Sequence, residues 1–332
     1  MTDALDGLLH AARQRRAALV VRLRAEGTDC WREFHGTVEG APGVAVDRYG
    51  ALLLVQLFRS ADPSLEVGHL RAVVAATAGE GDRVVIVDRR GGPAHVAVHG
   101  AHADEDFVVH EAGMPALVRA RHHGQDPWLF LDLRAGRRRI RELAPGRSVL
   151  NLFAYTCTAG LAAACTGARE VWNVDFSAGW LAVGERNLAL CGVDPGRVRF
   201  LREDCLAVLR QLAGIPLARF GKGPRVTRIE PRTFDLVILD PPRLAQGRIG
   251  KVDLVHDYQS LFKPAWLSTA SRGAILATNN VASVDAEDWL KSLTRCAEKA
   301  GQPVVSAELI APDDDFPSPD GRAPLKLALL RK

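Results

Sequence analysis

The stretch Ser148-Val149-Leu150-Asn151-Leu152-Phe153-Ala154-Tyr155-Thr156-Cys157-Thr158-Ala159-Gly160 decides the fold that this sequence predicts. It begins with an apolar run typical of a buried strand, and small and hydroxyl residues then lead into an alanine-rich helical pattern from Leu161. A helix N-terminus has unpaired backbone N–H groups and the positive end of the helix dipole, so this order commonly binds a polar part of a nucleotide-like ligand. Any βαβ unit can share the pattern, so the stretch alone does not establish a ligand site.

Acidic residues follow the next two predicted strands. A second strand at 170–174 ends in Asp175, about 20 residues after the loop, which is the spacing at which an acid reaches ribose hydroxyls in doubly wound sheets. A third strand at 198–201 is followed by Asp204 at the edge where open α/β sheets bind ligands. Each acid has an alternative reading as the N-cap of the helix that follows it. Together with the loop, the two acids favour a ribose-containing ligand.

The fourth and fifth strands end in more specific motifs. Phe234 to Leu239 is an apolar strand that leads into Asp240-Pro241-Pro242-Arg243. Because the two prolines have no N–H and restrict the backbone, they hold Asp240 rigidly at the edge of the sheet, which favours a functional role. The fifth strand, Gly273 to Ala277, ends in Thr278-Asn279-Asn280, three polar residues predicted to face the same crevice.

Composition predicts a soluble protein of two domains. The chain has 332 residues, 47% of them apolar, and a formal charge of +4 with a pI near 8.8, which permits an anionic partner without requiring one. No CxxC pair or zinc-like spacing is present, so we expect reduced thiols and no metal. We also expect a cytoplasmic protein, because no signal core or membrane-length apolar run occurs. The six cysteines are Cys30, Cys157, Cys165, Cys191, Cys205 and Cys296.

Residues 1–122 are predicted to form a smaller N-terminal α+β domain, and residues 123–332 the sheet domain. The N-terminal domain begins with a helix at 4–26 whose arginines indicate either a solvated face or an RNA-facing one. Short strands and one helix near 65–77 follow, with no catalytic pattern. The segment from His122 to Arg134 is an inter-domain connection or one wall of the pocket. The paired histidines at its start have no third ligand, so they predict no metal site.

A basic connection at 214–232 interrupts the sheet pattern between the third and fourth strands. Charge runs are usually just solvated, but a basic loop beside a ligand crevice suits contacts to nucleic-acid phosphates. The sequence therefore leaves both readings open for Arg219, Lys222, Arg225 and Arg228.

Taken together, these motifs resemble class I S-adenosylmethionine-dependent methyltransferases. The resemblance is greatest to the large-subunit ribosomal RNA methyltransferases that pair a small α+β domain with a Rossmann-like catalytic domain, and it runs from about Trp31 to the C-terminus. It implies an α/β fold with a Rossmann-like sheet closed by an antiparallel last strand, with hairpin strands near 303–310 and 325–330. It also implies the cofactor S-adenosyl-L-methionine and a large-subunit ribosomal RNA partner. The motifs that carry it are Val44-Ala45-Val46-Asp47-Arg48-Tyr49-Gly50, Phe130-Leu131-Asp132-Leu133-Arg134, Asn151 to Thr156, Val174-Asp175-Phe176-Ser177, Glu203-Asp204-Cys205 and Asp240 to Arg243.

The resemblance also implies roles for residues. Asp175 would bind the ribose, Asp204 would hold the adenine, and the segment at Asp240 would border the methyl group. The implied cofactor-binding residues are Phe130, Asp132, Arg134, Asn151, Phe153, Tyr155, Thr156, Asp175, Phe176, Ser177, Asp204, Cys205, Asp240 and Pro241. Pro242 and Arg243 are implied to contact the substrate, together with the basic loop, and a homodimer is compatible with the sequence.

Two departures from the family's pattern refine the expected chemistry. Cys157 stands where the first loop usually has glycine, so the turn is less permissive. Members that methylate cytosine C5 place a cysteine at the end of the fifth strand as the nucleophile, whereas this chain has Asn279 and Asn280 there. The asparagine pair resembles the branch that methylates guanine N7, which needs no covalent nucleophile. Asp240, Asn279 and Asn280 are therefore the expected catalytic residues, with an unpaired or flipped base as target.

Other functions remain as alternatives. A methyltransferase for cytosine C5, a small molecule or a protein would use the same cofactor half, and only an RNA enzyme would depend on the basic loop and on salt. Cys157 keeps open a non-catalytic RNA-binding protein with a decayed pocket. A dinucleotide oxidoreductase is disfavoured, because the loop lacks GxGxxG spacing.

Overall fold

The chain forms two compact units in the computed structural model, which describes residues 2–92, 95–121, 127–217, 227–247 and 250–332. The first unit contains Met1–Arg134 and Pro312–Gly321, and the second contains Ala135–Ala311 and Arg322–Lys332. The sequence predicts a boundary after residue 122, and the units divide later, at Arg134. The segment 312–321 belongs to the first unit because Asp313 and Asp315 form ion pairs with Arg134.

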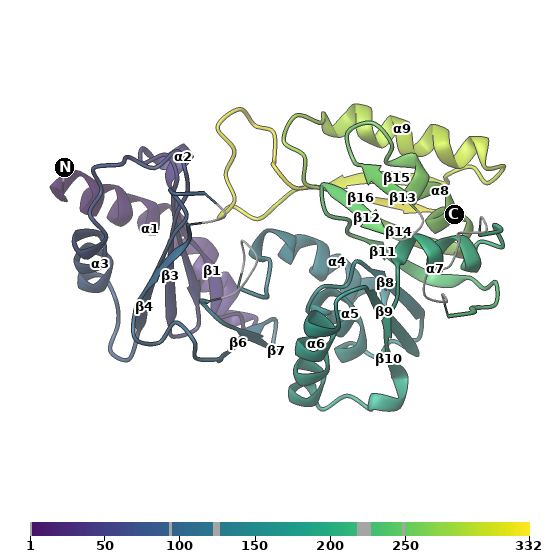
Figure 1. The fold of residues 1–332 in the computed structure, drawn as a ribbon, viewed down its shortest axis with the longest axis horizontal. Coiled ribbons are helices and arrows are strands. Elements are labelled where there is room, and N and C mark those ends of the chain that lie inside the picture. Colours follow the sequence, from purple (N-terminus) through teal and green to yellow (C-terminus); the bar gives the residue numbers. More distant parts are fainter. Residues whose placement is uncertain (1, 93–94, 122–126, 218–226, 248–249) are drawn as a thin grey trace. The chain divides into compact units, whose positions relative to one another are not determined.

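A five-stranded sheet in the order β1-β2-β3-β4-β5 forms the centre of the first unit (Figure 1). Only β3 and β4 pair in parallel, and the other neighbours are antiparallel. A separate hairpin of β6 and β7 follows the sheet. The elements are α1 (Thr2–Ala25), β1 (Cys30–His35), α2 (Gly36–Glu39), β2 (Val44–Tyr49), β3 (Leu52–Leu57), α3 (Val67–Ala76), β4 (Arg83–Asp88), β5 (Ala97–His99), β6 (Phe107–Glu111), β7 (Met114–Val118) and the 3₁₀ turn η1 (Leu131–Leu133).

Both faces of the central strand β3 are covered, which explains its unbroken apolar sequence. Leu53 and Val55 pack with residues of α1 and α3 on one face. Leu52 and Leu54 pack on the other face with residues of the β6–β7 hairpin, such as Val109. All of these side chains are buried, so the first unit has its own hydrophobic core.

The second unit contains a seven-stranded sheet in the order β10-β9-β8-β11-β14-β16-β15. The first five strands pair in parallel, and β16 runs antiparallel to both of its neighbours. This arrangement confirms the predicted Rossmann-like sheet with an antiparallel closing strand. The strands are β8 (Ser148–Leu152), β9 (Glu170–Asp175), β10 (Val198–Arg202), β11 (Phe234–Leu239), β14 (Thr269–Asn279), β15 (Ser306–Ile310) and β16 (Lys326–Arg331).

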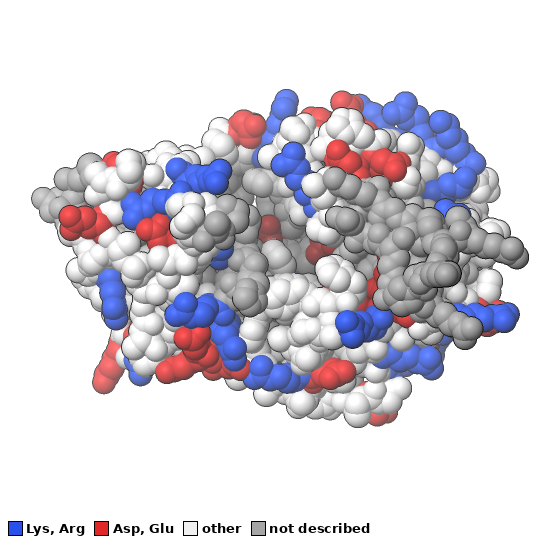
Figure 2. Space-filling model, viewed as in Figure 1, with Lys and Arg blue, Asp and Glu red and all other residues white. Residues whose placement is uncertain are grey.

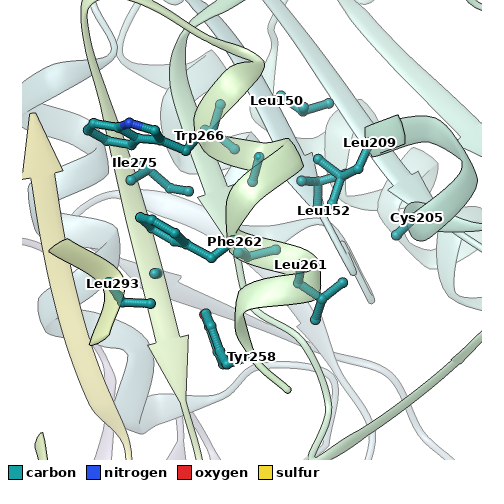
Figure 3. Close-up of a cluster of buried hydrophobic side chains, with 14 of the residues drawn as sticks. Leu150, Leu152, Cys205, Leu209, Tyr258, Leu261, Phe262, Trp266, Ile275 and Leu293 are labelled. Atoms are coloured by element: carbon teal, nitrogen blue, oxygen red, sulfur yellow. The ribbon is translucent and has the colours of Figure 1, made fainter. Parts of the chain in front are cut away.

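Helices cover the sheet because its strands alternate apolar side chains between two faces. One face packs against α7, α8 and α9 in a large apolar cluster that contains Leu150, Leu209, Phe262, Ile275 and Leu293 (Figure 3). The opposite side of β8 and β9 packs against α5. The helical elements are α4 (Arg134–Leu143), α5 (Thr158–Cys165), α6 (Ala178–Cys191), η2 (Pro195–Arg197), α7 (Cys205–Leu212), α8 (Gln259–Leu267) and α9 (Ala286–Lys299).

A short hairpin of β12 (Leu244–Gly247) and β13 (Gly250–Asp253) follows the Asp240-Pro241-Pro242 segment. The sequence analysis did not predict it, because each strand is only four residues long and lacks an apolar pattern. Within the described residues, no helix combines the length and the apolar character needed to cross a membrane.

Candidate active site

The loop after β8 has an unusual backbone. Phe153, Tyr155 and Cys157 all adopt left-handed conformations, with φ of 57°, 50° and 65°. Non-glycine residues seldom adopt this conformation, and such residues cluster at functional sites where the surrounding structure fixes them. Here the fixing contacts come from neighbouring elements. The N–H of Ala154 donates to the carbonyl of Val174 at 3.0 Å, so the loop is held against the end of β9.

Asp175 ends β9 and organises this loop. Its Oδ2 accepts the Tyr155 N–H at 2.9 Å, and its Oδ1 accepts the Ser177 N–H at 2.9 Å. Burial raises the pKa of this carboxyl, although backbone N–H groups act in the opposite direction. Because each carboxylate oxygen has two lone pairs, Asp175 can accept further hydrogen bonds from ribose hydroxyls. The N-cap of α6 is Ser177, whose Oγ accepts the Trp180 N–H at 3.3 Å, so Asp175 is not that cap.

Aromatic rings lie beside Asp175. Phe176 follows it directly and is 67% exposed, which is unusual for a large apolar side chain next to a buried acid. The Tyr155 ring packs on Trp180 of α6 with a centroid distance of 4.8 Å. A buried acceptor beside an exposed aromatic ring fits a ribose joined to a flat base, so these residues suit the nucleoside part of S-adenosylmethionine.

Cys157 occupies the position that glycine usually takes in the resembled family. Its left-handed backbone explains that preference, since glycine adopts positive φ without strain. The buried Cys157 side chain is accommodated by Gly184 of α6, because a Cβ added there would lie 2.5 Å from the Cys157 Sγ. Burial raises the pKa of the Cys157 thiol, with a further contribution from Asp175, so the thiol is protonated and unreactive.

Asp204 and Cys205 follow β10, the strand next to β9. Asp204 is the N-cap of α7, with its Oδ1 accepting the Leu206 N–H at 2.9 Å, so the capping alternative is confirmed and its adenine role stays a prediction. The Cys205 Sγ accepts the Phe153 N–H at 3.2 Å and donates to the Val174 carbonyl at 3.4 Å. Burial raises the pKa of the Cys205 thiol. Its contacts place it beneath the loop, as a support.

Thr156 and Asn151 also contact protein groups. The Thr156 carbonyl accepts a hydrogen bond from Asn187 Nδ2 of α6 at 3.2 Å, which ties the loop to that helix. The Asn151 Nδ2 donates to Asn173 Oδ1 at 2.8 Å in the interior. The two amides lie against Gly160 of α5, where an added Cβ would come within 2.1 Å of Asn173 Oδ1. The Asn151 side chain is therefore part of the packing between the sheet and α5.

Asp240 lies at the carboxyl end of β11, next to the end of β14. Thr278 Oγ1 donates a short hydrogen bond to Asp240 Oδ1. The Tyr258 hydroxyl donates to the Thr278 backbone carbonyl at 2.8 Å. Pro241 is buried, whereas Pro242 and the neighbouring Arg243 are exposed.

The two asparagines at this end differ in burial. Asn279 is fully buried, and its Oδ1 accepts the Val281 N–H at 2.9 Å, while its Nδ2 has no hydrogen-bond partner among the described residues. The Asn279 side chain is thus enclosed by protein and fixes the turn after β14 through its bond to Val281. Asn280 is exposed. Lys326 of β16 is buried here as well, and its Nζ donates to the carbonyls of Val281 and Pro324.

Phe130, Asp132 and Arg134 belong to the first unit. The contacts of Arg134 lie within that unit. Arg134 is only 2% exposed, and its Nη2 donates to Asp315 Oδ2 at 2.9 Å. Asp313 accepts from the same guanidinium at 3.1 Å. The Arg134 side chain thus holds the segment 312–321 in the first unit. The cofactor roles of all three residues stay predictions.

Several basic residues form ion pairs where the structure describes them. On the face drawn in Figure 2, positive side chains lie beside negative ones in several places, and most of the described surface is uncharged. Arg13 and Arg16 of α1 form ion pairs with Glu33 and Glu39, which accounts for part of that helix's charge within the first unit. In the basic connection, Arg228 is exposed and pairs with a nearby glutamate, whereas Arg219, Lys222 and Arg225 lie outside the described residues.

Sequence reasoning missed several residues that shape this site. Tyr258 precedes α8 and reaches the site only through the fold, because no motif surrounds it. Thr278 belongs to a motif that the sequence singled out, but its bond to Asp240 depends on the register of β11 and β14, in which Leu239 lies opposite Ala277. Gly184 and Asn187 of α6 have no local signal either.

The sheet order, the strained loop and the acids at successive strand ends define a class I, Rossmann-like nucleotide-binding enzyme fold. The chain matches the family model described as S-adenosylmethionine-dependent methyltransferase over residues 30–331. The chain therefore belongs to this family of S-adenosylmethionine-dependent methyltransferases, as the resemblance predicted. When bound, the cofactor supplies an electrophilic methyl group.

Curated relatives and solved structures agree with this assignment. A ribosomal RNA large subunit methyltransferase of Deinococcus radiodurans is 31% identical over 306 residues, which cover 89% of this chain and 70% of that protein. A ribosomal RNA large subunit methyltransferase K/L of Chromohalobacter salexigens is 32% identical over 269 residues, covering 78% of this chain and 34% of the relative. A methyltransferase structure from Streptococcus mutans covers 100% of this chain and 81% of its own, with a TM-score of 0.78 and 20% identity, which shows the shared fold.

Proposed function

We propose that this enzyme methylates RNA, and specifically a guanine N7 of large-subunit ribosomal RNA, by direct in-line transfer without a cysteine nucleophile. The similarity to relatives named as ribosomal RNA large subunit methyltransferases supports the RNA substrate. The observation that carries the chemistry is the end of β14, where the exposed amide of Asn280 follows the buried Asn279 and no cysteine stands in the sequence.

The cysteines argue against cytosine C5 chemistry. That reaction needs a thiolate near the base, because an unactivated ring carbon must first be attacked by a nucleophile. Cys157 and Cys205 are buried near the cofactor loop, and burial raises the pKa of both thiols. Cys165 and Cys191 are the last residues of α5 and α6, at the opposite ends of these helices from the loop.

Guanine N7 suits the polar groups at this edge. N7 has a free lone pair and no proton, so the enzyme needs no strong base and contributes mainly by orienting the base, which can supply several kcal/mol. The exposed Asn280 amide can donate to an acceptor atom on the guanine edge, and the buried Asn279 fixes the backbone before it through the Val281 N–H. Asp240, fixed by Thr278, would set the geometry of cofactor and base.

The proposal is tested first in cells. Ribosomal RNA from cells with and without this protein is digested and its modified nucleosides are mapped by mass spectrometry. We expect one 7-methylguanosine of the large subunit to disappear with the protein. Loss of 5-methylcytidine instead, or loss of no ribosomal RNA methyl group, contradicts the proposal, and the latter outcome favours a small-molecule or protein substrate.

A second test addresses Asn280 in purified enzyme. Asn280→Ala should lower methyl transfer to ribosomal RNA about tenfold or more, because it removes a hydrogen bond that orients the base. Binding of S-adenosylmethionine, measured by calorimetry, should stay unchanged for Asn280→Ala. Arg228→Gln tests phosphate contact separately, because it should weaken RNA binding most at low salt and lower the salt dependence of transfer. Undiminished transfer by Asn280→Ala removes that residue's role.

A further inference from the structure

A chain of two hydrogen bonds leads from the protein interior to Asp240. Thr278 is fully buried, and its side-chain hydroxyl donates to Asp240 Oδ1. The Tyr258 hydroxyl donates at 2.8 Å to the backbone carbonyl of the same threonine. Burial, followed by the nearby Asp240, raises the pKa of Tyr258 well above its ordinary value, so this hydroxyl remains a donor at physiological pH.

The elements that carry these groups are rigid. Tyr258 is buried at the start of α8, and its ring packs edge-on against Trp289 of α9 with a centroid distance of 5.4 Å. The same ring lies in the apolar cluster between the sheet and these helices (Figure 3). Thr278 is held in β14, where it pairs with Leu327 of β16. The hydroxyl of Thr278 therefore has a fixed position relative to β11 and its last residue.

We propose that Thr278 and Tyr258 are positioning residues, which fix the carboxylate of Asp240 in the orientation that methyl transfer requires. The inference rests on the proposed function, because it assumes that Asp240 borders the transferred methyl group. Neither residue touches the reacting atoms. Thr278 orients the carboxylate directly, and Tyr258 holds the Thr278 backbone so that its hydroxyl points at Asp240.

Side-chain variants separate this role from simple packing. Thr278→Val keeps the shape and removes the hydroxyl, and it should lower kcat for methyl transfer about tenfold or more, since a hydrogen bond to a charged group is lost. Thr278→Ser restores the hydroxyl and should recover most of kcat. Tyr258→Phe should have a smaller effect of the same kind. The affinity for RNA should be unchanged in all three variants.

A double-mutant cycle decides the outcome. If Thr278 acts through Asp240, Thr278→Val should add little to the defect of Asp240→Ala, because that variant has already lost the acceptor of the Thr278 hydroxyl. Defects that multiply, or a Thr278→Ser variant as slow as Thr278→Val, would overturn the proposal. If the wild-type enzyme methylates no RNA, the proposed function fails. The same double-mutant cycle is then measured on the affinity for S-adenosylmethionine. Independent effects of the two substitutions on that affinity would also overturn the positioning role of Thr278.

Discussion

The two compact units use charged residues in different ways. The first unit buries ion pairs: Arg16 contacts Glu39, Arg134 contacts Asp315, and Asp47 is fully buried against Arg32. In the second unit the central strands are mainly apolar, and the acids of the site lie at the carboxyl ends of strands. The contrast teaches that arginine-rich sequence in the first unit is largely structural, whereas the acids of the second unit gather at the strand ends where we propose that the cofactor binds. Each prediction below tests one side of this contrast.

The largest effect is expected in the first unit. Arg134→Ala leaves Asp315 and Asp313 without their cation, so it should lower the free energy of unfolding by ~3–5 kcal/mol, as breaking a buried ion pair does. Urea denaturation measures the change. Arg22→Ala is the control, because its 3.9 Å pair with Asp314 is exposed and should contribute only ~0.5 kcal/mol or less. Equal stability losses in the two variants would mean that burial does not distinguish these pairs.

In the second unit, Asp175→Ala should act on the ligand. It removes the acceptor at the end of β9, so the affinity for S-adenosylmethionine should fall about ten- to a hundredfold, the usual size for a charge-assisted hydrogen bond. Calorimetry measures the affinity. Asp194→Ala is the control, since that exposed acid caps η2 and pairs with Arg197 at the surface. Unchanged affinity in Asp175→Ala would place the ribose elsewhere.

A smaller effect is expected where α5 meets α6. Gly184→Ala forces its Cβ against the Cys157 Sγ, so it should destabilise the protein by ~1–3 kcal/mol, as overpacking does. The same change should cost less in a Cys157→Gly background, because the sulfur is gone and only the 3.1 Å contact with Phe200 remains. Thermal unfolding of the four proteins gives the coupling. If the stability losses of the two substitutions are additive, the Cys157 side chain does not need a glycine at position 184.

The smallest expected effect is on the stability of the protein at low pH. Burial alone would raise the pKa of Glu39, but hydrogen bonds from Arg16, the His35 N–H and Arg15 outweigh it and lower the pKa. A lowered folded-state pKa means that stability is full above the ordinary value of 4.5 and is lost as pH falls through the lower folded value. Glu39→Gln should remove that part of the pH dependence of unfolding. If the stability of the variant falls with decreasing pH as steeply as that of the wild type, other groups cause the pH dependence.

Sequence reasoning was strongest where local pattern and sheet geometry agree. The apolar runs and the acids after them predicted the parallel strands, and the closing hairpin at β15 and β16 is present as expected. It was weakest where contacts depend on distant residues. The segment 312–321 lies in the first unit because of ion pairs with Arg134, and neither end of that contact has a local signal.

The candidate site shows the same limit residue by residue. Asp175 and Asp240 could be placed from the sequence, because the carboxyl ends of parallel strands meet at one edge. The hydrogen bond between the Asn151 and Asn173 amides could not be predicted from the sequence. It depends on the strand register, because a shift by one residue moves a side chain to the other face of the sheet. The left-handed loop explains why glycine is usual at position 157, yet only the packing shows how cysteine fits there.

By itself, the sequence determined the order of strands and helices, the family and the acids at the strand ends, because these follow from periodicity and from motifs that are contiguous in the chain. The tertiary structure decided which side chains bond to which: Thr278 with Asp240, Tyr258 with Thr278, and Arg134 with Asp315. Such contacts join residues far apart in the chain, so their energies arise only after strand register and helix packing are fixed.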